Sequence, residues 1–552
     1  MTPKSIGKDA PRSRRGAAPS RPGRRRVAGV TIPLSALRTE EDWGIGEIPA
    51  LPHLAGWLKD EAGVGLIQLL PFQEISGAET SPYAALSAFA IDPMYVAASA
   101  LPELFGAHVE ALGVDGLATL ERARAREGVD YGAVRRIKER AHAFAFRRFL
   151  AEELAAGTAR ARDLLAFVDA RRAWLLDYAL FRALKDANGG RAWWDWPKEL
   201  RERRPAALAA ARAELAHGVL FYEYLQWSAH AQWAEARAAL RAIGVEVMGD
   251  LPFMVGRDSA DVWSRQHDFK LDGAVGAPPD AFSDEGQDWD LPPYDWAAMR
   301  ENDFAWLRAR ARHMGELFDR FRIDHLVGFF RTYQRDRATK RGANGKLVAG
   351  VFDPAAPDEQ LAHGERVVRA MRDAAAEHGA TLVAEDLGAV PDFVRAAITK
   401  LGVPGYRVLI WEKDGDRFRD PATYPALSVA CFGTHDTAPV VTWWAGLGAA
   451  ERAALLALPA MKRRGALPAT YSPDVQAALF ELLAAAPSEL VLFLFQELVG
   501  SSARVNTPGT TGDANWTYRL PLELARVRER PEVRERLARV KEALVKTARS
   551  RT

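Results

Sequence analysis

The stretch FRIDHLVGFFR, residues 321–331, is mostly apolar and aromatic, as in a buried strand, yet it carries Arg322, Asp324 and His325. Charges in a buried strand cost free energy unless a partner compensates them. Arg322 and Asp324 are two residues apart, so on a strand their side chains lie on the same face. Two interpretations follow: a buried ion pair, or a functional site at the end of a strand.

Seven other short apolar runs, several rich in β-branched residues, accompany this stretch along the chain. Such runs are typical of strands buried on both faces, and helix-like stretches separate most of them. The repeated strand–helix alternation predicts an α/β fold of the (β/α)8 TIM barrel type. The eight runs are residues 26–34, 64–71, 245–253, 321–329, 381–388, 406–412, 427–436 and 490–497.

Carboxylates lie toward the C-terminal ends of six of these runs. Barrels of this kind place their active sites at the C-terminal ends of the strands. The pattern therefore predicts an acid-rich site at the barrel mouth. The six residues are Asp250, Asp324, Glu385, Glu412, Asp436 and Glu497.

The gap between the second and third runs is too long for one loop. Residues 132–244 are dominated by Ala, Arg, Leu and Glu at helical spacing. We predict a helical insertion over about residues 100–240, within a catalytic barrel that spans 27–552. Aromatic patches in the insertion, such as RAWWDWPKEL (191–200), fit core packing better than a ligand platform.

Composition and charge place the chain among globular proteins, with 48% hydrophobic and 26% charged residues and a net charge of +2. Residues 1–26 carry nine Lys or Arg and one Asp, with Pro, Gly and Ser, and predict a disordered basic tail. The remainder is mildly acidic, which argues against a nucleic-acid enzyme. Contact of the tail with nucleic acid or a membrane is the alternative to a solvated tail.

The absence of targeting segments and the low cysteine content both bear on the cellular compartment of the protein. The chain has no apolar run of about 18 residues, so we expect no membrane span. Its start lacks an apolar segment, so we expect no signal peptide. Cys431 is the single cysteine, which excludes an internal disulfide and favours a cytoplasmic protein.

Two of the acids stand in contrasting surroundings. An Arg beside an Asp lowers the pKa of the Asp, so Arg322 would keep Asp324 ionised and able to act as a nucleophile. Glu385 follows the apolar residues 382–384, and desolvation raises the pKa of such a carboxyl, which suits a general acid. Asp386 points the other way on a continuing strand, and we expect it to bond to backbone or to a neighbouring strand.

A third acid, Asp436, follows His435 and precedes Trp443 and Trp444. Polar groups mixed with tryptophans suit sugars, although ordinary packing explains a Trp pair equally well. Two carboxylates in opposite protonation states can cleave a glycosidic bond. A separation of about 5 to 5.5 Å between them predicts retention of configuration.

A divalent metal site is the rival interpretation, with ligands drawn from Asp324, His325, Glu385 and His435. The chain has no H-x-H or H-E-x-x-H motif. Arg322 beside such a ligand would also repel a cation. We therefore expect no metal at this site.

Seven segments in a fixed order resemble one known family, the 4-α-glucanotransferases called amylomaltases or disproportionating enzymes (glycoside hydrolase family 77, α-amylase superfamily). The resemblance spans roughly residues 28–522. It implies the same (β/α)8 barrel with helical insertions and no required cofactor. The segments are ETSPYAALSAFAIDP (79–93), GDLPFMVGRDSADVW (249–263), GAPPDAFSDEGQDW (276–289), RIDH, AEDLG, THD and RVNTPGTTGDANWTYRL (504–520).

The resemblance also implies roles. Asp324 would be the nucleophile, Glu385 the acid/base, and Asp436 a ligand of the sugar in subsite −1, above a stacked Tyr83. A loop with Trp289 would cover the cleft on the acceptor side, unless Trp289 is only a packed anchor. The implied binding residues are Arg322, His435, Tyr83, Ser81, Asp280, Gln287, Trp289 and Asn506.

The chain departs from the family pattern near the acceptor side. Ala281 follows P-P-D where the family often has an aromatic residue, and Asp290 takes the Gly position of W-G-N-P. T-H-D is followed by Thr-Ala-Pro-Val. These changes leave the three acids intact and bear on the acceptor and the preferred chain length.

We therefore predict a retaining 4-α-glucanotransferase. It would pass an α-1,4-glucan from a maltodextrin to the 4-hydroxyl of glucose or an acceptor glucan, glycogen included, through a glycosyl-aspartate. We expect a monomer or homodimer without nucleic-acid or membrane partners. The alternatives are a hydrolase that uses the same acids and a non-catalytic glucan-binding protein on the same scaffold.

Overall fold

A computed structural model describes residues 26–549, except residues 78, 280–282, 511 and 513. The predicted basic tail therefore lies outside the described residues, apart from Arg26. Asp280 and Ala281 also lie outside them.

Eight parallel strands close into a barrel, and each is hydrogen-bonded to its neighbours in chain order. This confirms the predicted fold class, and each of the eight apolar runs supplies one strand. The strands are β1 (Val27–Ile32), β2 (Leu66–Leu69), β3 (Glu246–Leu251), β6 (Arg320–Ile323), β9 (Thr381–Ala384), β10 (Gly405–Val408), β13 (Ser428–Cys431) and β14 (Leu490–Leu494).

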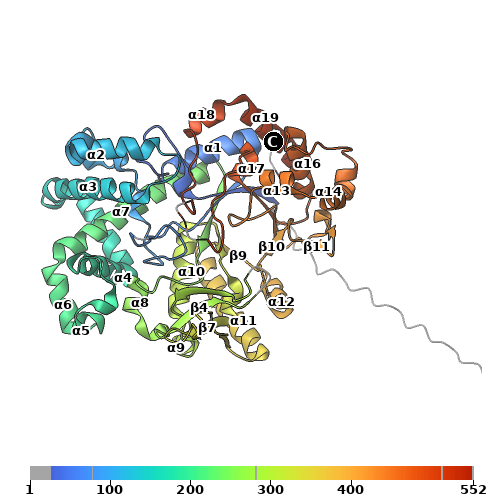
Figure 1. Ribbon diagram of the computed structural model, residues 1–552. Helices are drawn as coiled ribbons and strands as arrows, with labels where there is room; N and C mark the ends of the chain where they lie inside the picture. Colours follow the sequence, from blue (N-terminus) through green and yellow to red (C-terminus); the bar gives the residue numbers. More distant parts are fainter. Residues whose placement is uncertain (1–25, 78, 280–282, 511, 513, 550–552) are drawn as a thin grey trace, which may run out of the picture.

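Alternation along the strands separates two cores. Ala28, Val30 and Ile32 of β1 face the surrounding helices, whereas Val27 belongs to a smaller cluster inside the barrel, with Leu66 and other inward residues. The helices surround the strands (Figure 1). The main ones are α1 (Ala50–Ala62), α7 (Ala216–Ala242), α10 (Ala305–Leu317), α11 (Pro357–Ala376), α12 (Asp392–Leu401), α13 (Val440–Gly446), α16 (Pro473–Ala484) and α19 (Pro531–Lys546).

Helices fill the segment between β2 and β3 (Figure 1). The last of them, α7, packs on α1 and β3, as a barrel helix does, and α4 packs along α7. Trp193 and Trp196 are buried in this region and belong to the core, as predicted, whereas Trp194 of the same patch is exposed. The preceding helices are α2 (His108–Ala125), α3 (Tyr131–Phe149), α4 (Ala159–Ala187), α5 (Lys198–Arg201) and α6 (Pro205–Glu214).

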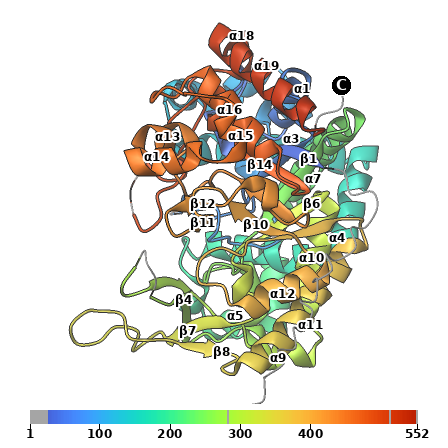
Figure 2. The same cartoon turned by 90° about the vertical axis from the view of Figure 1, so that its right-hand side faces the viewer.

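A second sheet stands beside the barrel and was not expected from the sequence (Figure 2). Its antiparallel order is β5-β4-β7-β8, so it joins the segment after β3 to the segment after β6. The strands are short and polar or glycine-rich, and they lack the longer apolar runs that mark the barrel strands. They are β4 (Gly273–Ala277), β5 (Gln287–Leu291), β7 (Thr332–Asp336) and β8 (Val351–Asp353).

The smaller elements lie in the remaining connections. Within the described part of the chain, no helix combines the length and the apolar character needed to span a membrane. The smaller elements are α8 (Ala260–Ser264), α9 (Trp296–Glu301), β11 (Lys413–Asp414), β12 (Arg417–Phe418), α14 (Ala449–Leu456), α15 (Pro459–Lys462), α17 (Phe495–Val499) and α18 (Leu524–Glu529).

Candidate active site

Arg322 is shared between two carboxylates. Its register partner on β3 is Asp250, and Nε of Arg322 donates to Oδ1 of Asp250 at 2.9 Å. Its Nη2 donates to Oδ1 of Asp324 at 2.6 Å, as the same-face spacing predicted. The Asp250 side chain is fully buried, whereas Asp324 keeps 26% of its side-chain surface exposed. The buried ion pair is therefore Arg322–Asp250, and Asp324 remains accessible at its edge.

The pKa of Asp324 reflects opposing influences. Burial raises it well above the ordinary value, the Arg322 guanidinium lowers it, and the nearby carboxyls of Asp250, Glu385 and Asp436 raise it further. As predicted, the Arg322 guanidinium lowers the pKa of Asp324. The effect of burial is larger, so the net pKa is raised. Arg322 is thus the group that favours the ionised form of Asp324.

Glu385 lies at the end of β9, where it accepts hydrogen bonds from the backbone N–H groups of His325 at 2.8 Å and Leu387 at 3.2 Å. Burial raises its pKa to about 7, which confirms the predicted direction. Asp386 turns away and accepts from the backbone N–H of Tyr406 on β10 at 2.6 Å, as expected.

Asp436 follows β13 and is held by two neighbours. Nδ2 of Asn506 donates to its Oδ1 at 2.6 Å, and Nη2 of Arg504 donates to its backbone carbonyl at 2.8 Å. Nε2 of His435 lies 3.5 Å from Oδ2. Asn506 and His435 therefore meet at Asp436, although Asn506 is 70 residues away in sequence.

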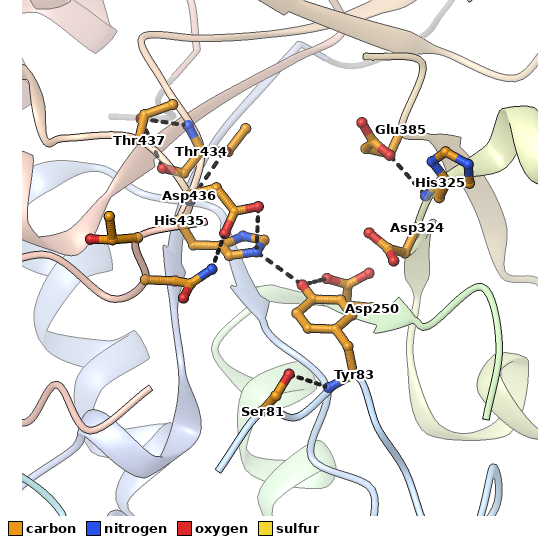
Figure 3. A network of polar contacts seen from close by, with 12 residues as sticks. Ser81, Tyr83, Asp250, Asp324, His325, Glu385, Thr434, His435, Asp436 and Thr437 are labelled. Atoms are coloured by element: carbon orange, nitrogen blue, oxygen red, sulfur yellow. Dashed lines mark hydrogen bonds and ion pairs between the residues drawn. The ribbon is translucent and has the colours of Figure 1, made fainter. Parts of the chain in front are cut away.

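Tyr83 forms the floor between the two sides of the site. Its hydroxyl donates to Oδ2 of Asp250 at 2.8 Å and lies 3.2 Å from Nε2 of His435. Ser81 lies beside Tyr83, and its Oγ accepts from the backbone N–H of Tyr83 at 3.4 Å. Figure 3 shows Asp324 on one side and Asp436 on the other, with the Tyr83 ring between and below them.

Two further side chains belong to this group but were not singled out from the sequence. Asp250 was noted only as a strand-end acid. Trp516 lies with its ring centroid 5.6 Å from Tyr83 and 5.8 Å from His435. It falls inside the segment 504–520, so the motif contained it, but only the fold shows its neighbours.

The tryptophans near the mouth differ in what they contact. Trp289 on β5 packs edge-on against the His325 ring at 5.0 Å, and its Nε1 donates to Oε1 of Gln287 at 2.9 Å. Trp444 is fully buried and its Nε1 donates to the backbone of Pro468. Trp443 packs on Phe418. The Trp pair therefore fits ordinary packing, and Asp280 of the same loop as Trp289 lies outside the described residues.

Two of the six strand-end acids have structural partners. Glu497 is fully buried and accepts from the backbone N–H groups of Leu494 and Val440 at 2.9 and 3.2 Å. Glu412 lies within 4 Å of Arg407 and Arg419. A carboxylate at a strand end therefore lies near the mouth of the barrel, but its position alone does not show a catalytic role.

The metal interpretation gains no support from the geometry. The described residues include no group of three or more His, Cys, Asp or Glu side chains arranged to hold a metal ion. His325 instead packs against Phe253 and Trp289, and burial lowers its pKa to about 4.

Comparison with known proteins places this site in a family. The family model described as 4-alpha-glucanotransferase (glycoside hydrolase family 77) matches residues 32–524. The chain belongs to this family. The 4-alpha-glucanotransferase of Thermus thermophilus is 33% identical over 496 residues, covering 86% of this chain and 93% of the relative. That of Chlamydia pneumoniae is 30% identical over 509 residues, covering 89% and 91%.

A solved structure agrees with the 4-alpha-glucanotransferase assignment. The amylomaltase from Streptococcus agalactiae in complex with acarbose has a TM-score of 0.76 and 25% sequence identity, with 96% of this chain and 100% of that chain covered. As a member of the family, the chain is an enzyme of the glycoside hydrolase type.

Proposed function

We propose that this enzyme is a retaining 4-α-glucanotransferase acting on maltodextrins. The observation that carries the proposal is a pair of carboxyl groups at the barrel mouth: Asp324, which accepts a hydrogen bond from Arg322 at 2.6 Å, and Glu385, whose pKa burial raises to about 7. Two carboxyl groups with divided roles are what glycosidic cleavage needs.

The first step uses both acids. The Asp324 carboxylate attacks the anomeric carbon of the donor glucan, and the bond from that carbon to the leaving oxygen breaks. Glu385 gives its proton to this oxygen, so the reducing-end fragment leaves as a neutral sugar. Asp436 accepts hydrogen bonds from the hydroxyls of the bound ring, and the ring stacks on Tyr83.

The second step transfers the glucan. The 4-hydroxyl oxygen of an acceptor attacks the same anomeric carbon, and its proton passes to the Glu385 carboxylate. The bond to Asp324 breaks and the carboxylate is restored. Two displacements at one carbon return the α configuration. Gln287 and Trp289 would face the acceptor side, and Arg322, His435 and Asn506 would support the donor ring.

Maltotriose as the only substrate should yield glucose together with a ladder of longer oligosaccharides. Each glycosyl-enzyme reacts with another sugar molecule rather than with water, so some chains lengthen while others shorten. Chromatography of the products over time measures this. Products that are only shorter than maltotriose would favour the hydrolase alternative.

Activity toward the donor should fall as pH rises through about 7. Glu385, with its pKa raised to about 7 by burial, holds the proton for the leaving oxygen below this pH and loses it above. kcat/KM for maltotriose should then decrease about tenfold per pH unit on the alkaline side. The pH profile of Glu385→Gln is the check, because that variant has no proton to lose and its profile should lack the alkaline limb. If the alkaline limb were unchanged in Glu385→Gln, Glu385 would not be the general acid.

Glycogen as an acceptor and a cytoplasmic setting are part of the same proposal. Cys431 is the protein's single cysteine and is buried inside the barrel, so the fold does not depend on an oxidising compartment. A monomer or a homodimer is likewise part of the proposal.

A further inference from the structure

Strand β5 has an irregularity next to the active site. Leu291 pairs with Val275 of β4 and Asp288 pairs with Gly276, so Trp289 and Asp290 form a bulge between the two pairs. Bulges turn side chains in new directions and are frequent beside active sites. Here the turned side chain is that of Trp289, which packs edge-on against His325.

Asp290 occupies a costly backbone conformation in this bulge. Its φ is +51°, in the left-handed region that glycine adopts most readily. The side chain of Asp288 supports the turn, because its Oδ1 accepts from the backbone N–H of Asp290 at 3.1 Å. Aspartate tolerates this conformation better than most residues with a side chain, and further contacts of its carboxylate compensate the remaining strain.

The compensation comes from the connection between β7 and β8, which reaches out from the barrel beside β4 (Figure 2). Nζ of Lys340 lies 2.7 Å from Oδ2 of Asp288 and 2.9 Å from Oδ1 of Asp290. Nε of Arg337 lies 3.1 Å from Oδ1 of Asp290. Burial opposes ionisation of Asp290, yet hydrogen bonds from Arg337 and Lys340 leave its pKa below the ordinary value.

A series of contacts links the β7–β8 connection to the active site. Lys340 fixes the bulge, the bulge fixes Trp289, and Trp289 packs on the ring of His325. The backbone N–H of His325 in turn donates to Oε2 of Glu385 at 2.8 Å. The cluster of Asp288, Asp290, Arg337 and Lys340, here called the bulge clamp, thus supports the side of the site where Trp289 lies.

We propose that Asp290, held by Lys340 and Arg337, is a positioning residue for the acceptor. The bulge clamp holds Trp289 in the place where an incoming sugar packs, and so favours sugar over water in the second step. This inference rests on the proposed transferase function. It goes beyond that function by assigning acceptor selection to an ion cluster outside the site.

Two variants test the inference separately. Asp290→Asn keeps a side chain that tolerates positive φ and removes the charge. Lys340→Met removes the shared cation at a position without backbone strain, so it remains informative if the first variant folds poorly. Both are assayed as the full chain with maltotriose as donor and isotopically labelled glucose as the varied acceptor, so that label entering oligosaccharides measures transfer.

We expect each variant to raise the KM for glucose about two- to fivefold, the range for a partly exposed ion pair. The share of donor lost to hydrolysis should rise in parallel, while kcat/KM for maltotriose changes less. A general loss of structure would instead lower both steps together. The effect of the double variant should be smaller than the two single effects combined, since both substitutions remove the Lys340–Asp290 contact.

Asp303→Asn is a matched control. Asp303 also has positive φ, at +52°, and pairs with Arg308 at 2.9 Å, but it lies before α10 on the outside of the barrel. It should leave the KM for glucose unchanged. The inference would be overturned if both Asp290→Asn and Lys340→Met left the KM for glucose and the share of hydrolysis unchanged, although the wild-type enzyme made the ladder from maltotriose. A wild-type enzyme that makes no ladder would overturn the proposed function and this inference together.

Discussion

Asp324→Asn should abolish transfer, with a loss of kcat of at least about 10⁴-fold. The amide is nearly isosteric with the carboxylate but cannot form the glycosyl-enzyme, because it lacks a negatively charged oxygen to attack the anomeric carbon. Arg322 keeps its buried partner Asp250 at 2.9 Å in the variant, so the barrel should stay folded. Rates with maltotriose, together with the melting temperature, measure both expectations.

Mass spectrometry gives a direct view of the same step. Wild-type enzyme quenched during turnover should carry a glycosyl group on the peptide that contains Asp324, and the variant should carry none. Asp319→Asn is the control, because Asp319 lies at the opposite end of the same strand and pairs with Arg237 at 2.7 Å. It should lower stability without removing the glycosyl-enzyme. Turnover by Asp324→Asn near the wild-type rate would refute the nucleophile assignment.

The local part of the site was predictable from the sequence. The two-residue spacing of Arg322 and Asp324 places them on one face of a strand, and the contact between them is present. The apolar neighbours of Glu385 predicted a raised pKa, which burial produces. Both inferences need only the period of a strand and the chemistry of adjacent residues.

The long-range part was not predictable in the same way. Arg322 meets Asp250 across 72 residues, and Tyr83 meets His435 across 352. Such pairs depend on the register between strands and on the closure of the barrel, which no single run of sequence contains. The resemblance to a family indicated that Tyr83 and His435 are both binding residues, but not that Asp250 joins them through the Tyr83 hydroxyl.

The sheet beside the barrel shows a further limit. Strands β5 (QDWDL) and β7 (TYQRD) are short and rich in polar residues, so they lack the apolar pattern that identified the barrel strands. Asp290 was recognisable as an unusual residue at a glycine position. Its positive φ and its contacts with Lys340 and Arg337 explain how an aspartate is accommodated there.

Glu385→Gln should slow cleavage of maltotriose by about 10²- to 10⁴-fold, the usual contribution of a general acid. Glutamine keeps one acceptor oxygen for the shorter hydrogen bond, from the backbone N–H of His325 at 2.8 Å. It loses the longer one, from Leu387 at 3.2 Å, which the other carboxylate oxygen accepts, so most of the site geometry should survive. What the variant lacks is the proton for the leaving oxygen. A donor whose leaving group departs without protonation, such as an α-glucosyl fluoride, should therefore form the glycosyl-enzyme at a rate much closer to wild type.

The dependence on leaving group separates an acid from a merely structural carboxyl. Asp386 is adjacent in sequence but accepts from the backbone N–H of Tyr406 at 2.6 Å. Asp386→Asn should therefore act through the position of β10 and slow both donors by a similar factor. Pre-steady-state rates with the fluoride and with maltotriose distinguish the two patterns. Equal slowing of both donors by Glu385→Gln would mean that Glu385 supports the site without transferring a proton, because loss of a proton donor must weigh most on the poorer leaving group.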